Sequence, residues 1–221
     1  MARAAEVVES WILESILSGQ LKPGDHIPHL TLARKLKVSN NPVIQVLRKL
    51  EGRGILDRAP DGVCRVRDYS HREIFAALAV REAIEGVAAR FCAQFGTDED
   101  LAVVGVRFDK MIQAYRKGNY APSEELAFHK AIVEFSYAPF LVHLYDTILI
   151  IRQTFTLRAG GRSAAELIAI HEPIMEAISR RDADAAERAA RKHVAEAREE
   201  YWKMAGVGQC EHAPAGGGPK A

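Results

Sequence analysis

Residues 29–56 read HLTLARKLKVSNNPVIQVLRKLEGRGIL, and this stretch decides the fold of the N-terminal part of the chain. Apolar residues recur at helical spacing over 29–36 and again over 41–52. Residues 37–40 (KVSN) separate the two segments, and Ser39 or Asn40 can cap the second helix. Two short helices joined by such a tight turn are typical of a helix-turn-helix.

The flanking sequence completes a winged helix-turn-helix. A further helix is predicted over about residues 4–18, which Gly19 and a turn around Pro23 bring to an end. After the third helix, residues 55–57 and 63–67 resemble two short strands around a Pro-Asp-Gly turn, which is the pattern of a wing. We therefore expect residues 1–69 to form a winged helix-turn-helix DNA-binding domain.

The polar start of the second helix in this motif predicts base contacts. That end of the helix normally meets base edges in the major groove of double-stranded DNA. The residues expected there are Ser39, Asn40, Asn41 and Gln45. Asn and Gln amides can each form two hydrogen bonds with adenine. Phosphate contacts, which fix register rather than sequence, are expected from Arg34, Arg48 and Lys49.

Basic residues concentrate in the same region, although the net charge of +1 decides nothing about a nucleic-acid partner. Residues 1–70 contain 11 Lys or Arg and 8 Asp or Glu. Between Arg34 and Arg53 the sequence has six basic residues and a single acidic one, Glu51. Such a cluster fits a phosphate-contacting patch, but an ordinary solvated helix face would have the same composition.

From His71 onward the sequence predicts helices alone. Their approximate ranges are 71–95, 98–117, 122–137, 139–158, 164–180 and 183–204. The predicted fold class is therefore mainly α, with residues 70–205 as an all-helical domain. Residues 206–221 are rich in Gly, Pro and Ala, and we expect them to form a disordered tail.

Composition excludes several other classes of protein. The sequence has no run of 18 or more apolar residues, and acidic residues stand where a signal peptide needs an apolar run. We therefore expect a cytoplasmic protein with no membrane partner. Cys64, Cys92 and Cys210 form no CxxC pair, so neither a disulfide framework nor a thiolate zinc site is predicted.

Histidine spacing in the helical region predicts a candidate metal site. Glu125 and His129 are four residues apart on one predicted helix and therefore share a face. His171 and His193 each lie 11 residues from the break at Asp182, so antiparallel helices would bring them to the same height. A carboxylate with three imidazoles suits a first-row divalent ion. A lone histidine on a helix is nevertheless more often an ordinary surface or core residue.

The N-terminal motif resembles the DNA-binding domain of the GntR family of transcriptional regulators. The resemblance rests on 16–24 (ILSGQLKPG), 32–39 (LARKLKVS), Pro42-Val43 and 47–56 (LRKLEGRGIL), within a match of about 65 residues. It implies binding to double-stranded DNA.

The recognition helix departs from the family pattern. The family usually reads Ser-Arg-Thr-Pro-Val-Arg-Glu where this chain has SNNPVIQ at 39–45, so Asn40 and Ile44 replace both arginines. This difference predicts an unusual operator or weaker binding. We hypothesise that Asn40 and Gln45 shift recognition toward A·T pairs.

Residues 70–205 resemble the FCD ligand-binding domain of the FadR subfamily. The matching segments are 125–129 (ELAFH), 171–178 (HEPIMEAI) and 182–193 (DADAAERAARKH). Metal-binding members of this subfamily use an Asp and three histidines. The resemblance therefore implies a divalent transition metal (Zn, Ni or Mn), a homodimer, and four ligands, with a Glu in place of the usual Asp: Glu125, His129, His171 and His193.

The same resemblance implies a small carboxylate effector. In the family the effector takes open coordination positions on the metal. Arg81 matches a family arginine that would bind the effector carboxylate through two parallel hydrogen bonds. Arg152 is a second candidate, although its position also suits a residue that snorkels from an apolar helix face. The leading interpretation is a homodimeric repressor whose effector changes the fit of two wing domains to a palindromic operator.

Two alternatives remain open at this stage. The open metal position could activate water in a metal-dependent enzyme, or the ion could merely brace the helices. Against an enzyme, the sequence has no general-base signature such as HExxH, and a DNA-binding module would then have no role.

Overall fold

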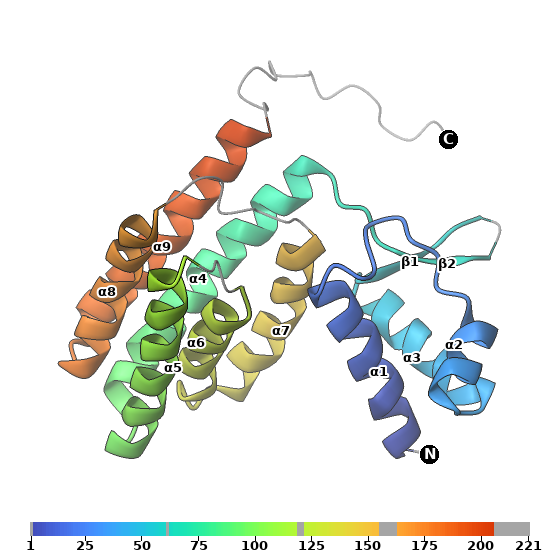
Figure 1. The fold of residues 1–221 in the computed structure, drawn as a ribbon, viewed down its shortest axis with the longest axis horizontal. Helices are drawn as coiled ribbons and strands as arrows, with labels where there is room; N and C mark the ends of the chain where they lie inside the picture. Colours follow the sequence, from blue (N-terminus) through green and yellow to red (C-terminus); the bar gives the residue numbers. More distant parts are fainter. Residues whose placement is uncertain (1, 61, 119–121, 155–162, 206–221) are drawn as a thin grey trace, which may run out of the picture.

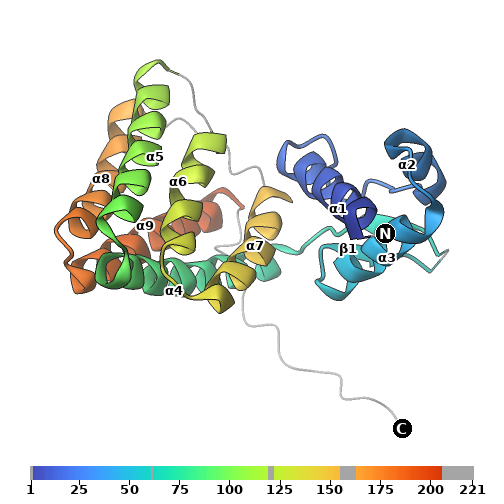
Figure 2. The same ribbon diagram turned by 90° about the horizontal axis from the view of Figure 1, so that it is seen from below.

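The computed structural model describes residues 2–60, 62–118, 122–154 and 163–205, and within them the chain forms two units (Figure 1). One unit combines three helices with a two-stranded sheet, and the other consists of helices (Figures 1 and 2). The predicted tail over 206–221 lies outside the described residues. No helix in the described part is long and apolar enough to cross a bilayer.

The N-terminal unit is a winged helix-turn-helix, as the sequence predicts. Its elements are α1 (Ala2–Leu17), α2 (His29–Leu36), α3 (Asn40–Gly52), β1 (Leu56–Arg58) and β2 (Cys64–Val66). The strands pair antiparallel, with Leu56 opposite Val66. Strand β1 is shifted by one residue from the predicted range of 55–57, and β2 is one residue shorter at each end than the predicted range of 63–67. The turn between α2 and α3 forms because Lys37 adopts a left-handed φ of 54° and Ser39 is the extended N-cap of α3.

One apolar core holds this unit together and decides which face of α3 is exposed. Val8 and Ile12 of α1 pack with Val46 and Leu50 of α3, and all four are buried. Burying this stripe turns the polar residues of α3 outward, because residues three and four apart share a helix face.

The second unit contains the remaining helices of the described chain. They are α4 (His71–Phe95), α5 (Asp98–Arg116), α6 (Pro122–Glu134), α7 (Pro139–Thr154), α8 (Ala164–Ser179) and α9 (Ala183–Met204). The prediction of a helix over 122–137 was wrong at its end, because α6 stops at Glu134 and Tyr137 takes a left-handed φ of 53°. The part of the predicted 139–158 helix beyond Thr154 lies outside the described residues.

Helix α4 packs along α9, and a glycine allows the two to approach closely (Figure 1). A Cβ added at Gly86 would lie 2.6 Å from Cγ of Arg191 on α9. Real Cβ atoms essentially never make contacts this short. The two helices would therefore have to separate, or the Arg191 side chain would have to change its rotamer at the Cα–Cβ bond.

Gly86→Ala is therefore expected to destabilise the protein by about 1–3 kcal/mol, the usual result of overpacking. Gly105→Ala on α5 is the matched control, because the nearest atom to its added Cβ would be Met175 Cε at 3.7 Å, an ordinary contact. Alanine in place of glycine inside a helix should stabilise by about 0.5–1 kcal/mol. Urea unfolding measures both variants, and an unchanged or raised stability for Gly86→Ala would contradict this packing.

Contacts made by residues 67–70, which join β2 to α4, connect the two units. The Tyr69 hydroxyl donates a hydrogen bond to the Gly54 carbonyl, which follows α3. The Arg67 guanidinium lies 2.6 Å from Glu73 at the start of α4 and 3.7 Å from Asp57 in the wing. Helix α1 also touches α7 (Figure 1). The N-terminus of α4 is thus fastened to the wing.

Candidate metal centre and DNA-reading face

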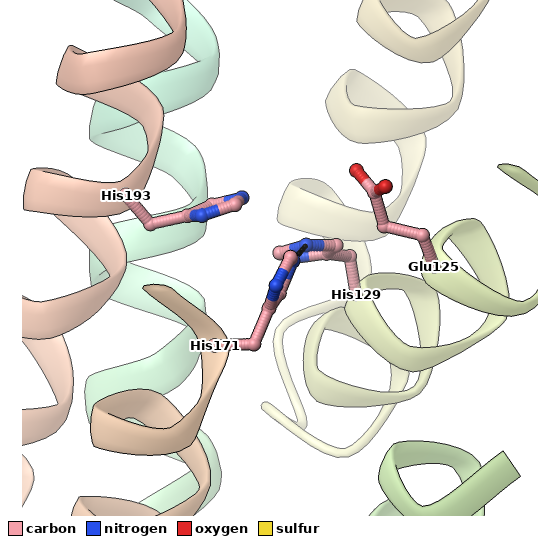
Figure 3. A group of neighbouring side chains, drawn as sticks. All are labelled: Glu125, His129, His171 and His193. Carbon is pink, nitrogen blue, oxygen red and sulfur yellow. Dashed lines mark hydrogen bonds between the residues drawn. The ribbon is translucent and has the colours of Figure 1, made fainter. Parts of the chain in front are cut away.

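Four polar side chains converge in the interior of the helical unit (Figure 3). Glu125 and His129 come from α6, His171 from α8 and His193 from α9, and all four are buried. One nitrogen or oxygen from each lies within 4.8 Å of the others. The structure therefore brings together the four residues that the sequence singles out as metal ligands.

The hairpin formed by α8 and α9 explains how two distant histidines meet. The chain reverses at Arg181, which has a left-handed φ of 57°, and Asp182 caps α9 by accepting a hydrogen bond from the Ala185 amide. Equal distances from this reversal place His171 and His193 at one level, with ring centroids 4.4 Å apart.

Hydrogen bonding fixes the orientation of the His171 ring. Its Nδ1 lies 2.7 Å from the Leu167 carbonyl oxygen, and because a carbonyl only accepts, Nδ1 carries the proton. Burial, reinforced by the neighbouring His129, lowers the pKa of His171 to about 4, so the ring is neutral at pH 7. The lone pair on Nε2 then points at Nε2 of His129, 3.3 Å away.

The residues present fit a divalent cation. Burial lowers the pKa of His193 well below its ordinary value, with a further contribution from His171, so this imidazole is also neutral and available as a ligand. His193 Nδ1 is buried and has no hydrogen-bond partner among the described residues. An orphaned buried nitrogen, two neighbouring imidazoles and a carboxylate form the donor set that zinc and similar first-row ions prefer.

A tyrosine holds the carboxylate ligand in place. The Tyr115 hydroxyl on α5 donates a hydrogen bond of 2.9 Å to Oε2 of Glu125, and both residues are buried. Glutamate has one more rotatable bond than the aspartate usual in the related family, so a fixed partner limits the directions its carboxylate can take. Tyr115 lies on α5, outside the Glu and His pattern by which the sequence indicates the site.

Tyr115→Phe is expected to weaken divalent-metal binding about 10-fold, the lower end of the range for losing a partner that orients a ligand. The ring stays, so packing around Phe128 and His171 is kept while the hydroxyl is lost. Competition between the protein and a chelating dye measures the affinity. Tyr137→Phe on the surface is the control, and equal metal affinity in wild type and Tyr115→Phe would contradict the role of the hydroxyl.

Arg81 and Glu85 form a buried ion pair beside the cluster. Arg81 is 1% exposed, and its Nε lies 2.5 Å from Oε1 of Glu85 on the next turn of α4. Burial disfavours the charge of Glu85, but Arg81 and His129 hold the pKa of its carboxyl well below the ordinary value. Arg81 Nη2 is buried without a hydrogen-bond partner among the described residues. Arg152 lies on α7, and its side chain is outside the described part of the structure.

The residues predicted to contact DNA lie at the surface of the N-terminal unit. Exposed side chains at or near the start of α3 are Ser39, Asn40, Asn41 and Gln45, and Arg34 on α2 and Arg48 on α3 are exposed as well. Lys49 differs, because its Nζ lies 2.7 Å from the Glu9 carboxylate of α1 and braces α1 against α3.

A cleft separates α3 from the wing. Its volume is about 640 Å³, and its walls include Thr31, Ile44, Arg48 and Arg58. Arg58 of β1 pairs with Glu51 of α3 at 2.9 Å, a contact that the sequence pattern does not predict. The middle of α3 and the wing therefore border one concave surface.

Two family models match the chain, one on each unit. The model described as "Bacterial regulatory proteins, gntR family" matches residues 4–66. The model described as "FCD domain" matches residues 73–196. Together they account for both halves of the architecture.

Curated relatives are similar over most of the chain. The "Glc operon transcriptional activator" of Escherichia coli strain K12 is 30% identical, over 86% of this chain and 85% of the relative. The "Probable D-xylose utilization operon transcriptional repressor" of Paenarthrobacter nicotinovorans is 27% identical, again over 86% of this chain and 85% of the relative.

A solved structure has the same overall fold. "E. coli McbR/YncC" superposes with a TM-score of 0.77 at 21% identity, over 91% of this chain and 98% of that chain. Identity this low bears on the fold alone. The relatives and the fold together indicate a DNA-binding transcriptional regulator rather than an enzyme.

Proposed function

We propose a function for this chain, which belongs to the gntR family of bacterial regulatory proteins and carries an FCD domain. In this proposal it is a repressor whose affinity for its operator is controlled by a small carboxylate effector at a metal site. The observation that carries the proposal is the convergence of Glu125 and three histidines beside Arg81. That cluster lies in a helical unit joined to a DNA-reading unit.

Each side chain of the cluster has a role in this proposal. Glu125, His129, His171 and His193 would hold a zinc, nickel or manganese ion, which supplies positive charge and an open coordination position for a carboxylate oxygen. Arg81 Nη2, buried and unpaired among the described residues, would bond to the same carboxylate. A charged ligand in a buried site needs such paired charges.

Helix α4 offers a route from this site to the DNA-reading unit. It carries Arg81 and Glu85 in its middle and is fastened to the wing at its start through Glu73 and Arg67. A shift of α4 on effector binding would therefore move the wing. In the operator complex, Ser39, Asn40, Asn41 and Gln45 would meet base edges. Arg34, Arg48 and Lys49 would meet phosphates, and Lys49 would first have to leave Glu9.

We propose that the protein acts as a homodimer on a palindromic operator. Support comes from an apolar stripe on the outer face of α4, spaced three and four residues apart: Ala76, Val80, Ala83 and Val87. Val80 is 49% exposed, and Phe140 at the start of the adjoining α7 is 73% exposed. A second copy of the chain would cover these residues.

Val80→Asp is expected to convert the dimer into a monomer, because each half of the symmetric interface would then bury an unpaired carboxylate. Val106→Asp on α5 is the matched control, since Val106 is 53% exposed and lies off the stripe. Sedimentation velocity gives the masses. A dimeric Val80→Asp variant would rule out this stripe as the interface.

The function is tested by measuring operator affinity of the full chain, with the operator first selected from random duplexes. Fluorescence anisotropy is followed after chelation, with metal added, and with metal plus a panel of small carboxylates. Release of DNA by one carboxylate only when metal is present supports the proposal. If no carboxylate changes the operator affinity while metal raises the melting temperature of the protein, the ion only stabilises the helical unit.

A further inference from the structure

Glu85 is a buried carboxylate that touches both the metal-ligand cluster and Arg81. It is 3% exposed and lies on α4. Oε1 accepts hydrogen bonds from Arg81 Nε at 2.5 Å and from the Tyr145 hydroxyl at 3.2 Å. Oε2 lies 3.0 Å from Nδ1 of His129. Burying a carboxylate costs free energy, so a buried carboxylate is expected to have a polar role in addition to packing.

The geometry at His129 indicates this role. A metal-binding histidine usually directs its second ring nitrogen at a carboxylate or carbonyl, which fixes the tautomer and makes the ligating nitrogen more basic. His171 has such a partner in the Leu167 carbonyl. For His129 the corresponding group is Glu85, whose Oε2 lies 3.0 Å from His129 Nδ1 and has no hydrogen-bond partner among the described residues. With a metal on Nε2, the Nδ1–H of His129 would turn toward this oxygen.

Glu85 acts on the anion-binding side of the site as well. It engages Nε of Arg81 and thereby sets the plane of the guanidinium, while Nη2 stays without a partner among the described residues. One carboxylate thus orients a metal-ligand candidate on α6 and the arginine on α4.

We infer that Glu85 is a positioning residue of the metal centre, lying outside the four ligands and joining His129 to Arg81. The inference rests on the metal site of the proposed function. It adds a residue that the four-ligand pattern does not contain, and it predicts that metal affinity depends on a side chain that never touches the ion.

Glu85→Gln tests the inference with little change of volume. The amide keeps hydrogen-bonding capacity but loses the charge and can present an NH₂ group to His129. We expect Co²⁺ to bind about 10–100-fold more weakly, the range for removing such a partner, with altered visible absorption bands. Glu82→Gln is the matched control, because it removes the charge of a carboxylate on the same helix that pairs with Arg198 and does not belong to the cluster. Its Co²⁺ affinity should equal that of wild type.

A second variant guards against loss of folding. Glu85→Gln leaves Arg81 as an unpaired buried cation, so Glu85→Gln with Arg81→Gln removes both charges and is compared with Arg81→Gln alone. Far-ultraviolet circular dichroism of the metal-free proteins verifies the fold. Weaker Co²⁺ binding in the double variant than in Arg81→Gln supports the role of Glu85. Equal affinities overturn it while leaving the metal site intact, whereas a wild type that binds no Co²⁺ refutes the site itself.

Discussion

His193→Gln should lower the affinity for a divalent transition metal by about 100-fold or more. Four-ligand sites bind zinc with apparent free energies of about 10–16 kcal/mol, so one ligand carries roughly a quarter of that. A loss of about 3 kcal/mol corresponds to about two orders of magnitude in the dissociation constant. His193 is 7% exposed and its Nδ1 has no partner in the described structure, so its loss breaks no hydrogen bond that is seen there.

His143→Gln is the control for this experiment, since His143 is an exposed histidine of the same unit on α7. Both variants are titrated against a chelator of known affinity, and bound metal is counted by elemental analysis after dialysis. Wild-type affinity in His193→Gln, or an equal loss in His143→Gln, would show that the ion binds elsewhere.

Replacing Asn40 and Gln45 together by alanine should weaken binding to the selected operator by on the order of 100-fold or more. A side chain that forms two hydrogen bonds with a base contributes about 1–3 kcal/mol of discrimination. Both side chains are exposed at the start of α3, so the core of the unit is not disturbed. Gln113→Ala, at an exposed position of α5, is the control.

The dependence of the affinity loss on DNA sequence distinguishes contacts to bases from contacts to phosphates. The Asn40 and Gln45 variant should lose its preference at particular base pairs, whereas Arg48→Ala should weaken binding to all sequences and reduce the salt slope by about 1. Selection from random DNA checks the expected A·T preference. A G-rich half-site, or an unchanged affinity of the double variant, would contradict the assignment of these two residues.

Helical periodicity predicted much of the fold and of the site. It placed Val46 and Leu50 in the core and therefore turned Gln45 outward, since one helix cannot bury both faces. It also paired His171 with His193, because two helices joined by a short reversal keep their register. The end of α6 was missed because Tyr137 adopts a left-handed φ that tyrosine rarely takes, and its sequence gives no turn signal.

Contacts between helices that are distant in sequence could not be predicted in this way. Periodicity assigns a residue to a face but does not name the side chain opposite. Glu85 lies four residues after Arg81, which suggests an ion pair, yet nothing in the spacing indicates that His129 is its second neighbour. Lys49 was likewise grouped with phosphate contacts, and its partner Glu9 comes from a helix 40 residues earlier.

Metal-edge anomalous scattering from crystals grown with zinc tests the central claim most directly, because it locates the ion without reference to any functional assay. The account predicts one peak in each chain, enclosed by Glu125, His129, His171 and His193. No peak within this cluster, with zinc bound at surface residues alone, would contradict it.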